Sequence, residues 1–204
     1  MRKDHVWKLV LVVMGGLLLI TAGCVGSSSP TQFYVLSSMP DTGEESRAQP
    51  AEDRTAIGVG PVDLPLYLDR PQIMTRISEN RMRLADFDQW AEPVTDNFTR
   101  VLMKNLSELL SREPVAIFSS QGTTPLDLRV SVDVIRFDGS PGKRVQLMAR
   151  WIIYDEVDKK VLVTKDSNIE EPLTGSGYEA MASGLSRTVE ILSKDIAEGI
   201  KGVL

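Results

Sequence analysis

The sequence is poor in histidine and cysteine, which many catalytic and metal sites require. It contains one histidine, His5, and one cysteine, Cys24, and both lie near the start of the chain. If the first 23 residues are removed and Cys24 is modified, the remaining chain can form neither a Ser-His or Cys-His pair nor a histidine- or cysteine-based metal site. We therefore expect no metal and no cofactor, and most hydrolase mechanisms are excluded.

The motifs that bind nucleotides and calcium are also missing. Gly142-Lys143 lacks the upstream glycine of a phosphate loop, and Gly58-x-Gly60 lacks a third glycine and runs into Pro61. Asp155-Glu156-x-Asp158 has no glycine at the sharp turn that a calcium loop needs. Pairs of carboxylates could still support glycoside hydrolysis, but the sequence singles out no such pair.

Long hydrophobic runs are absent except at the N-terminus, where an apolar segment of about twelve residues, 9–20, is too short to span a membrane. Basic residues precede it, and Ala22-Gly23-Cys24 follows it. This layout predicts a lipoprotein signal peptide at 1–23 and lipidation of Cys24, with its thiol in a thioether and its amine acylated, for example by palmitate. Thr21 departs from the aliphatic residue usual at that position. The alternative is an ordinary signal followed by a free or buried cysteine.

Removal of residues 1–23 would also change the charge of the chain. That segment carries Arg2, Lys3, Lys8 and Asp4, a net charge of +2, so the formal charge goes from -5 to -7. Long-range electrostatics then favour neither nucleic acid nor anionic lipid headgroups as partners, and favour protein contact and lipid anchoring instead. Residues 24–32 form a polar tether, in which the eight residues after Cys24 reach at most about 26 Å.

Residues 33–204 are expected to form a single α+β domain. Alternating residues predict strands near 33–36, 57–62, 73–78, 82–84, 115–118, 126–134, 145–154 and 161–165. Apolar spacings of three and four predict two long amphipathic helices at 93–112 and 177–201, packed on one face of a twisted, mostly antiparallel mixed sheet. Ser176 and Glu179 have the spacing of a capping box, and Met39–Thr55 is expected to be a solvated loop.

One loop is unusually apolar. Leu64-Pro65-Leu66-Tyr67-Leu68 lies between two expected strands, and Pro65 restricts its own backbone and that of Leu64. The large side chains either fold onto the core or form an exposed contact patch, and the sequence leaves both readings open.

This loop also carries a resemblance to a known family. Together with Asp69-Arg70-Pro71-Gln72-Ile73, Trp90-Ala91-Glu92-Pro93 and the lipoprotein signal, it resembles the PqiC-type membrane-integrity transporter subunits, also described as the ABC-type transport auxiliary lipoprotein component. The resemblance runs from about Cys24 to the C-terminus. It implies a fold like that of the N-terminal domain of TolB. It also implies delivery to the outer membrane, since Val25 stands where aspartate commonly signals retention in the inner membrane.

The function that the resemblance implies is non-enzymatic. The chain would be an outer-membrane lipoprotein of an intermembrane lipid-transport system, facing the periplasm and supporting membrane integrity. Its partner would be an MCE-domain protein anchored in the inner membrane, and a homo-oligomer is a further expectation. The residues expected to contact a partner are Leu64, Pro65, Leu66, Tyr67, Leu68, Arg70 and Trp90. The alternatives are a lipid-anchored periplasmic hydrolase that uses carboxylates, and a lipoprotein that itself binds a lipid in an apolar cleft.

Overall fold

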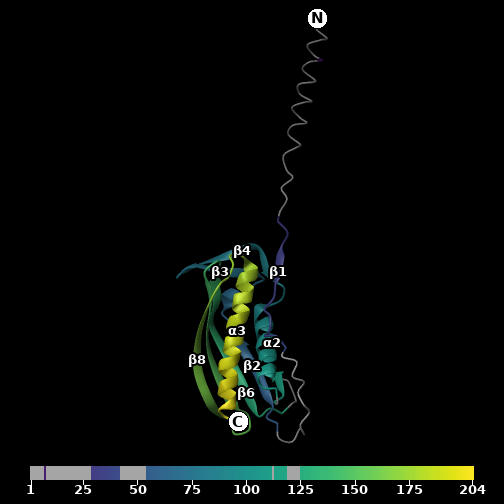
Figure 1. The fold of residues 1–204 in the computed structure, drawn as a ribbon, viewed down its shortest axis with the longest axis vertical. Coiled ribbons are helices and arrows are strands. Elements are labelled where there is room, and N and C mark those ends of the chain that lie inside the picture. The colour runs from purple at the N-terminus through teal and green to yellow at the C-terminus, as the bar shows by residue number, and fades with distance from the viewer. Residues whose placement is uncertain (1–6, 8–28, 42–53, 112, 119–124) are drawn as a thin grey trace. The chain divides into compact units, whose positions relative to one another are not determined.

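The computed structural model describes residues 7, 29–41, 54–111, 113–118 and 125–204 (Figure 1). The chain divides into two units, Met1–Pro30 and Thr31–Leu204, and the fold given below is that of the second. Apart from residue 7, the expected signal peptide lies outside the described residues, as do Cys24 and the middle of the expected loop Met39–Thr55. No helix in the described part is long and apolar enough to cross a membrane.

The larger sheet of the described chain has the strand order β5-β2-β6-β7-β8. Its strands are β2 (Ile57–Asp63), β5 (Val115–Ile117), β6 (Leu128–Ser140), β7 (Arg144–Asp155) and β8 (Lys160–Pro172). β2 pairs in parallel with both β5 and β6, whereas β6, β7 and β8 form the antiparallel meander that the sequence predicts. Val130, Val132 and Val134 are buried, as their alternation with polar residues indicates.

A register shift in β6 changes which side chains face the core. The pairing with β7 slips between Val134 and Arg136, and Ile135 is 55% exposed. Beyond the shift Phe137 is buried, and its ring packs edge-on against Phe98 with centroids 5.2 Å apart. Asp138 is on the opposite face of the strand from Phe137, yet it is also fully buried. The far end of β6 is therefore covered on both faces.

A smaller sheet, ordered β1-β4-β3, provides the second cover. Its strands are β1 (Gln32–Tyr34), β3 (Gln72–Ser78) and β4 (Arg81–Trp90), and β3 and β4 form the expected hairpin. The sequence predicted one sheet, whereas the described residues form two. The difference arises because β1 pairs in parallel with the end of β4 instead of joining the larger sheet, and β4 is longer than expected.

Two helices pack side by side on one face of the larger sheet, as expected (Figure 1). Helix α2 (Val94–Leu109) lies against β2 and β5, and helix α3 (Tyr178–Lys201) lies against β7 and β8. Each buries an apolar stripe. The fit is close at Gly199 of α3, where a Cβ atom would lie 2.8 Å from the Trp151 ring.

The helix ends differ in detail from the sequence prediction. Pro93 is the N-cap of α2 rather than its first helical residue, and the helix ends at Leu109 instead of residue 112. At the start of α3, Gly177 is the N-cap and no side chain caps the helix, so the predicted capping box of Ser176 and Glu179 is wrong. The extended backbone of Gly177 places Ser176 one position too early to accept from the first turn.

Buried polar side chains of the helices hold the segment that follows β1. The backbone N–H of Leu36 donates to Asn97 Oδ1 at 2.6 Å, that of Ser37 to Ser186 Oγ at 3.0 Å, and that of Met39 to Asn105 Oδ1 at 2.9 Å. These contacts satisfy the backbone of a segment that belongs to no strand. The entry of the chain into the domain is thus fixed by α2 and α3.

Candidate functional site

The apolar loop singled out by the sequence forms one tight helical turn. Pro65 caps it with an extended backbone, and Leu66–Leu68 form a 3-10 turn, η2. The N–H of Leu68 donates to the Pro65 carbonyl at 2.9 Å. Proline suits this place because its fixed φ is already that of the turn and it has no N–H to satisfy.

The large side chains of the loop divide between core and surface. Leu68 is buried, and Leu64 and Tyr67 are half-buried against the core, whereas Leu66 is 85% exposed. Leu68 therefore folds onto the core and Leu66 is exposed, whereas a contact patch formed by the loop stays a prediction.

The two other residues expected to contact a partner lie in contrasting places. Arg70 is exposed, whereas Trp90 is buried and its backbone N–H donates to the Pro71 carbonyl at 2.7 Å. The role of these residues in partner binding stays a prediction, and of the seven only Leu66 and Arg70 are exposed.

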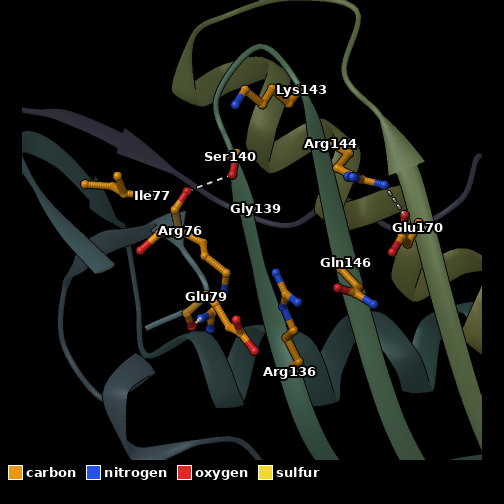
Figure 2. Close-up of a pocket in the computed structure, with 11 residues that line it drawn as sticks. Arg76, Ile77, Glu79, Arg136, Gly139, Ser140, Lys143, Arg144, Gln146 and Glu170 are labelled. Carbon is orange, nitrogen blue, oxygen red and sulfur yellow. Dashed lines mark hydrogen bonds and ion pairs between the residues drawn. The ribbon is translucent and has the colours of Figure 1, made fainter. Parts of the chain in front are cut away.

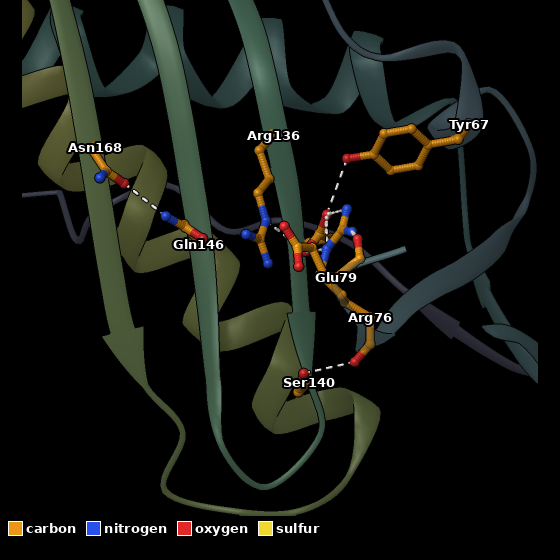
Figure 3. Close-up of polar contacts among 8 residues, drawn as sticks. Tyr67, Arg76, Glu79, Arg136, Ser140, Gln146 and Asn168 are labelled. Carbon is orange, nitrogen blue, oxygen red and sulfur yellow. Dashed lines mark hydrogen bonds and ion pairs between the residues drawn. The ribbon is translucent and has the colours of Figure 1, made fainter. Parts of the chain in front are cut away.

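The loop is joined to the larger sheet by a charged cluster of Tyr67, Arg76, Arg136 and Asp138, called here the Asp138 cluster (Figure 3). Arg76 Nε and Nη2 donate to the Asp138 carboxylate at 2.9 and 2.7 Å. Arg136 Nε donates to Asp138 Oδ1 at 3.0 Å, and the Tyr67 hydroxyl donates to Oδ2 at 3.1 Å. A planar guanidinium that holds a carboxylate through two bonds gives direction as well as energy.

The electrostatics of the cluster keep its charges fixed. Burial by itself would raise the pKa of Asp138, but hydrogen bonds and positive charge from Arg76 and Arg136 outweigh it and hold the pKa below its ordinary value. Burial, followed by the charge of Asp138, raises the pKa of Tyr67. Asp138 therefore stays ionised near neutral pH, and Tyr67 stays protonated as a donor.

A polar pocket of about 380 Å³ opens beside this cluster, between the end of β3 and the turn that joins β6 to β7 (Figure 2). Arg76, Glu79, Arg136 and Lys143 contribute charged side chains to its wall. The hydroxyl of Ser140 donates to the Arg76 carbonyl at 2.7 Å and closes the pocket between the two sheets. On its other side, Arg144 and Glu170 form an ion pair at 2.8 Å.

The arrangement is better suited to holding two sheets together than to catalysis. The one fully buried carboxylate of the cluster, Asp138, is engaged by two arginines and a tyrosine, so it is poorly placed to donate or accept a proton. Within the described residues, no group of three or more histidine, cysteine or acidic side chains could hold a metal ion. The sequence reading missed this cluster. The one available signal was Arg136 and Asp138 at a spacing of two on a strand, which places them on one face.

Comparison with known proteins gives matches over nearly the whole chain. Two curated relatives, each named Intermembrane transport lipoprotein PqiC, come from Escherichia coli (strain K12) and Shigella flexneri. Each is 25% identical over 194 residues, which cover 95% of this chain and 98% of the relative.

Solved structures share the fold. One, described as an uncharacterized protein, has a TM-score of 0.68 at 20% identity and covers 84% of this chain and 99% of its own. A DUF330 protein from Xanthomonas campestris has a TM-score of 0.65 at 15% identity and covers 82% of this chain and 93% of its own. These likenesses confirm the α+β fold, whereas the expected likeness to the N-terminal domain of TolB stays a prediction.

The family follows from a further match. A family model described as the ABC-type transport auxiliary lipoprotein component matches residues 34–197, which include β2 to β8, helix α2 and most of helix α3. This agrees with the resemblance read from the loop at 64–73 and from Trp90-Ala91-Glu92-Pro93. The chain belongs to the family of ABC-type transport auxiliary lipoprotein components.

Proposed function

We propose that this protein is a non-enzymatic lipoprotein of the outer membrane, anchored through Cys24 and facing the periplasm. There it docks an MCE-domain partner that is anchored in the inner membrane, and it supports the transport of lipid between the two membranes. The observation that carries the proposal is the family match over residues 34–197. The name of the curated relatives, which refers to intermembrane transport, supports it.

Features of the chain agree with each part of the proposal. Ala22-Gly23-Cys24 after an apolar run supports the lipid anchor, and Val25 supports delivery to the outer membrane. The exposed Leu66 and Arg70 give the loop a surface on which a partner can bind. The polar walls of the pocket beside the Asp138 cluster do not favour the alternative in which the protein encloses a lipid chain.

Retention of the partner is the main test. A tagged copy is purified from detergent-solubilised membranes, and the proteins that remain bound are identified by mass spectrometry. We expect an MCE-domain protein among them. A preparation that repeatedly retains no MCE-domain protein, although the tagged copy is at its natural level, would contradict the docking role.

The anchor is tested separately by replacing Cys24 with alanine. Two or more acyl chains give stable membrane attachment, so we expect the wild type to fractionate with outer membranes and Cys24→Ala to be lost from the membrane fraction completely. Fractionation on a density gradient measures both outcomes. If Cys24→Ala sediments with outer membranes as well as the wild type does, the lipid anchor is wrong.

A further inference from the structure

The small sheet exposes a phenylalanine on each of two paired strands, Phe33 on β1 and Phe87 on β4. Parallel pairing sets Phe33 of β1 opposite Gln89 of β4, and Tyr34 opposite Trp90. Tyr34 and Trp90 face inward: Trp90 is buried, and the Tyr34 ring lies 6.5 Å from that of Tyr178 on α3. Side chains alternate along β1, so Phe33 is on the opposite face of the strand from Tyr34. On β4, Phe87 precedes Gln89, the partner of Phe33, by two residues.

Both rings of this surface, called here the Phe33 face, reach solvent. Phe33 is 64% exposed and Phe87 is 43% exposed, and Val35, just beyond β1, is 50% exposed. A single exposed apolar residue needs no explanation, but two exposed phenylalanines on paired strands add apolar surface whose removal from water is favourable. Phenylalanine is among the residues that membrane-surface segments bury at the boundary between lipid headgroups and acyl chains.

The position of the Phe33 face in the chain indicates which surface covers it. β1 begins at Gln32, and the tether of eight residues after Cys24 reaches at most about 26 Å. The helices fix the segment after β1 through Leu36 and Ser37, so Phe33 cannot swing away from the body of the domain. The small sheet is therefore the part of the domain that a lipid anchor on Cys24 holds nearest to the bilayer.

We propose that Phe33 and Phe87 insert into the lipid surface to which Cys24 is anchored, so that the domain rests on the membrane with its small sheet downward. This proposal rests on the lipid anchor of the proposed function. The mature chain has a net charge of -7, so electrostatic attraction to anionic lipid is unfavourable and an apolar contact is the available mode of binding.

The opposite end of the domain supplies a matched control. Val157, in the turn between β7 and β8, is 70% exposed. The Ser140 end of β6 touches β3 of the small sheet. Val157 lies beyond the other end of the twelve-residue strand β7, which at about 3.3 Å per residue is about 40 Å from the Ser140 end. Figure 1 shows the small sheet at the end of the domain opposite the C-terminus.

The test uses the full-length lipidated protein in vesicles of phosphatidylethanolamine and phosphatidylglycerol. Cys24 is the only cysteine of the chain and is occupied by lipid, so an introduced cysteine is the sole labelling site. Phe87→Cys, Phe33→Cys and Val157→Cys each receive a polarity-sensitive nitrobenzoxadiazole label, and spin-labelled phosphatidylcholine is added as a quencher. Thermal melts of the three proteins check that each is folded.

We expect the labels at positions 33 and 87 to emit at shorter wavelength and to be quenched several-fold more strongly than the label at 157. Equal quenching at all three positions would overturn the proposal. A short-wavelength label that spin-labelled lipid does not quench would also overturn it, because protein would then cover the face. If the unlabelled protein fails to float with the vesicles, the lipid anchor itself is wrong and the proposal falls with it.

Discussion

At the scale of single residues, Asp138 is the acceptor that joins Tyr67, Arg76 and Arg136 in one cluster. It is fully buried, and its partners Arg76 and Arg136 are only about a fifth to a third exposed. The cluster is stable because each formal charge has a partner, and removal of one member leaves the others uncompensated. Asp166 offers a contrast, because it makes two similar bonds to Arg150 while 62% exposed.

We expect Asp138→Asn to lower the free energy of unfolding by about 3 kcal/mol, since two partly buried guanidinium groups lose their counter-charge. Asp166→Asn should change the free energy of unfolding far less than Asp138→Asn does, because an exposed pair contributes little. Urea denaturation of the non-lipidated protein measures both. Equal losses in the two variants would show that the Asp138 cluster has no special part in stability.

The pH dependence of stability follows from the same carboxylate. The pKa of Asp138 is lower in the folded state than its ordinary value of about 3.8. Its contribution is therefore complete above about pH 5 and is lost as the pH falls below about 4, through the folded-state pKa. The difference in unfolding free energy between wild type and Asp138→Asn should be constant from about pH 5 to 8 and should shrink in acid. If the difference between the two proteins grows in acid, the pKa of Asp138 is raised in the folded state and not lowered.

At the scale of elements, the loop between β2 and β3 has two functions in one turn. Leu68 fixes the turn to the core, and Leu66, two residues earlier, presents its side chain to solvent. The half-buried Tyr67 connects the turn to Asp138. The turn is thereby rigid, and a partner that binds Leu66 would meet a surface already in place, with little entropy to lose.

Truncation of the two leucines should separate these functions. Leu68→Ala is expected to cost about 2 to 4 kcal/mol of stability, as for other large buried side chains. Leu66→Ala should change stability by less than about 0.5 kcal/mol. Thermal melting measures the first effect, and retention of the MCE-domain partner should fall in Leu66→Ala. Full retention by a normally melting Leu66→Ala would remove Leu66 from the interface.

At the scale of the whole molecule, the sequence predicted the elements better than their assembly. The alternation around Val130 to Val134 gave β6, and the apolar spacing from Val94 to Leu109 gave α2 within a few residues. Both are local patterns. The separate small sheet was missed because its contacts are distant in sequence, as with Tyr34 and Asp88, which are 54 residues apart. No local pattern specifies such a pairing.

The candidate site was predicted only in part, for a related reason. The apolar loop was visible in the sequence because leucines and a tyrosine lie next to Pro65. The role of Asp138 was not visible in the sequence. The register shift after Val134 moves the core-facing residues of β6 from even to odd positions, so Asp138 is on the outer face. A polar residue on the outer face of a strand is normally solvated. Asp138 is buried because β3 covers that face of β6, and its bonds to Arg76 of β3 depend on the tertiary fold.

The hydrogen bonds from Leu36, Ser37 and Met39 to the two helices also have a mechanical consequence. If the protein is anchored by its N-terminus and binds a long partner, as proposed above, the chain is under tension whenever the distance between the membranes changes. A pull on the tether is met first by the pairing of β1 with β4 and then by bonds to Asn97, Ser186 and Asn105. Force thus passes into α2 and α3, and the meander of β6, β7 and β8 lies outside its path.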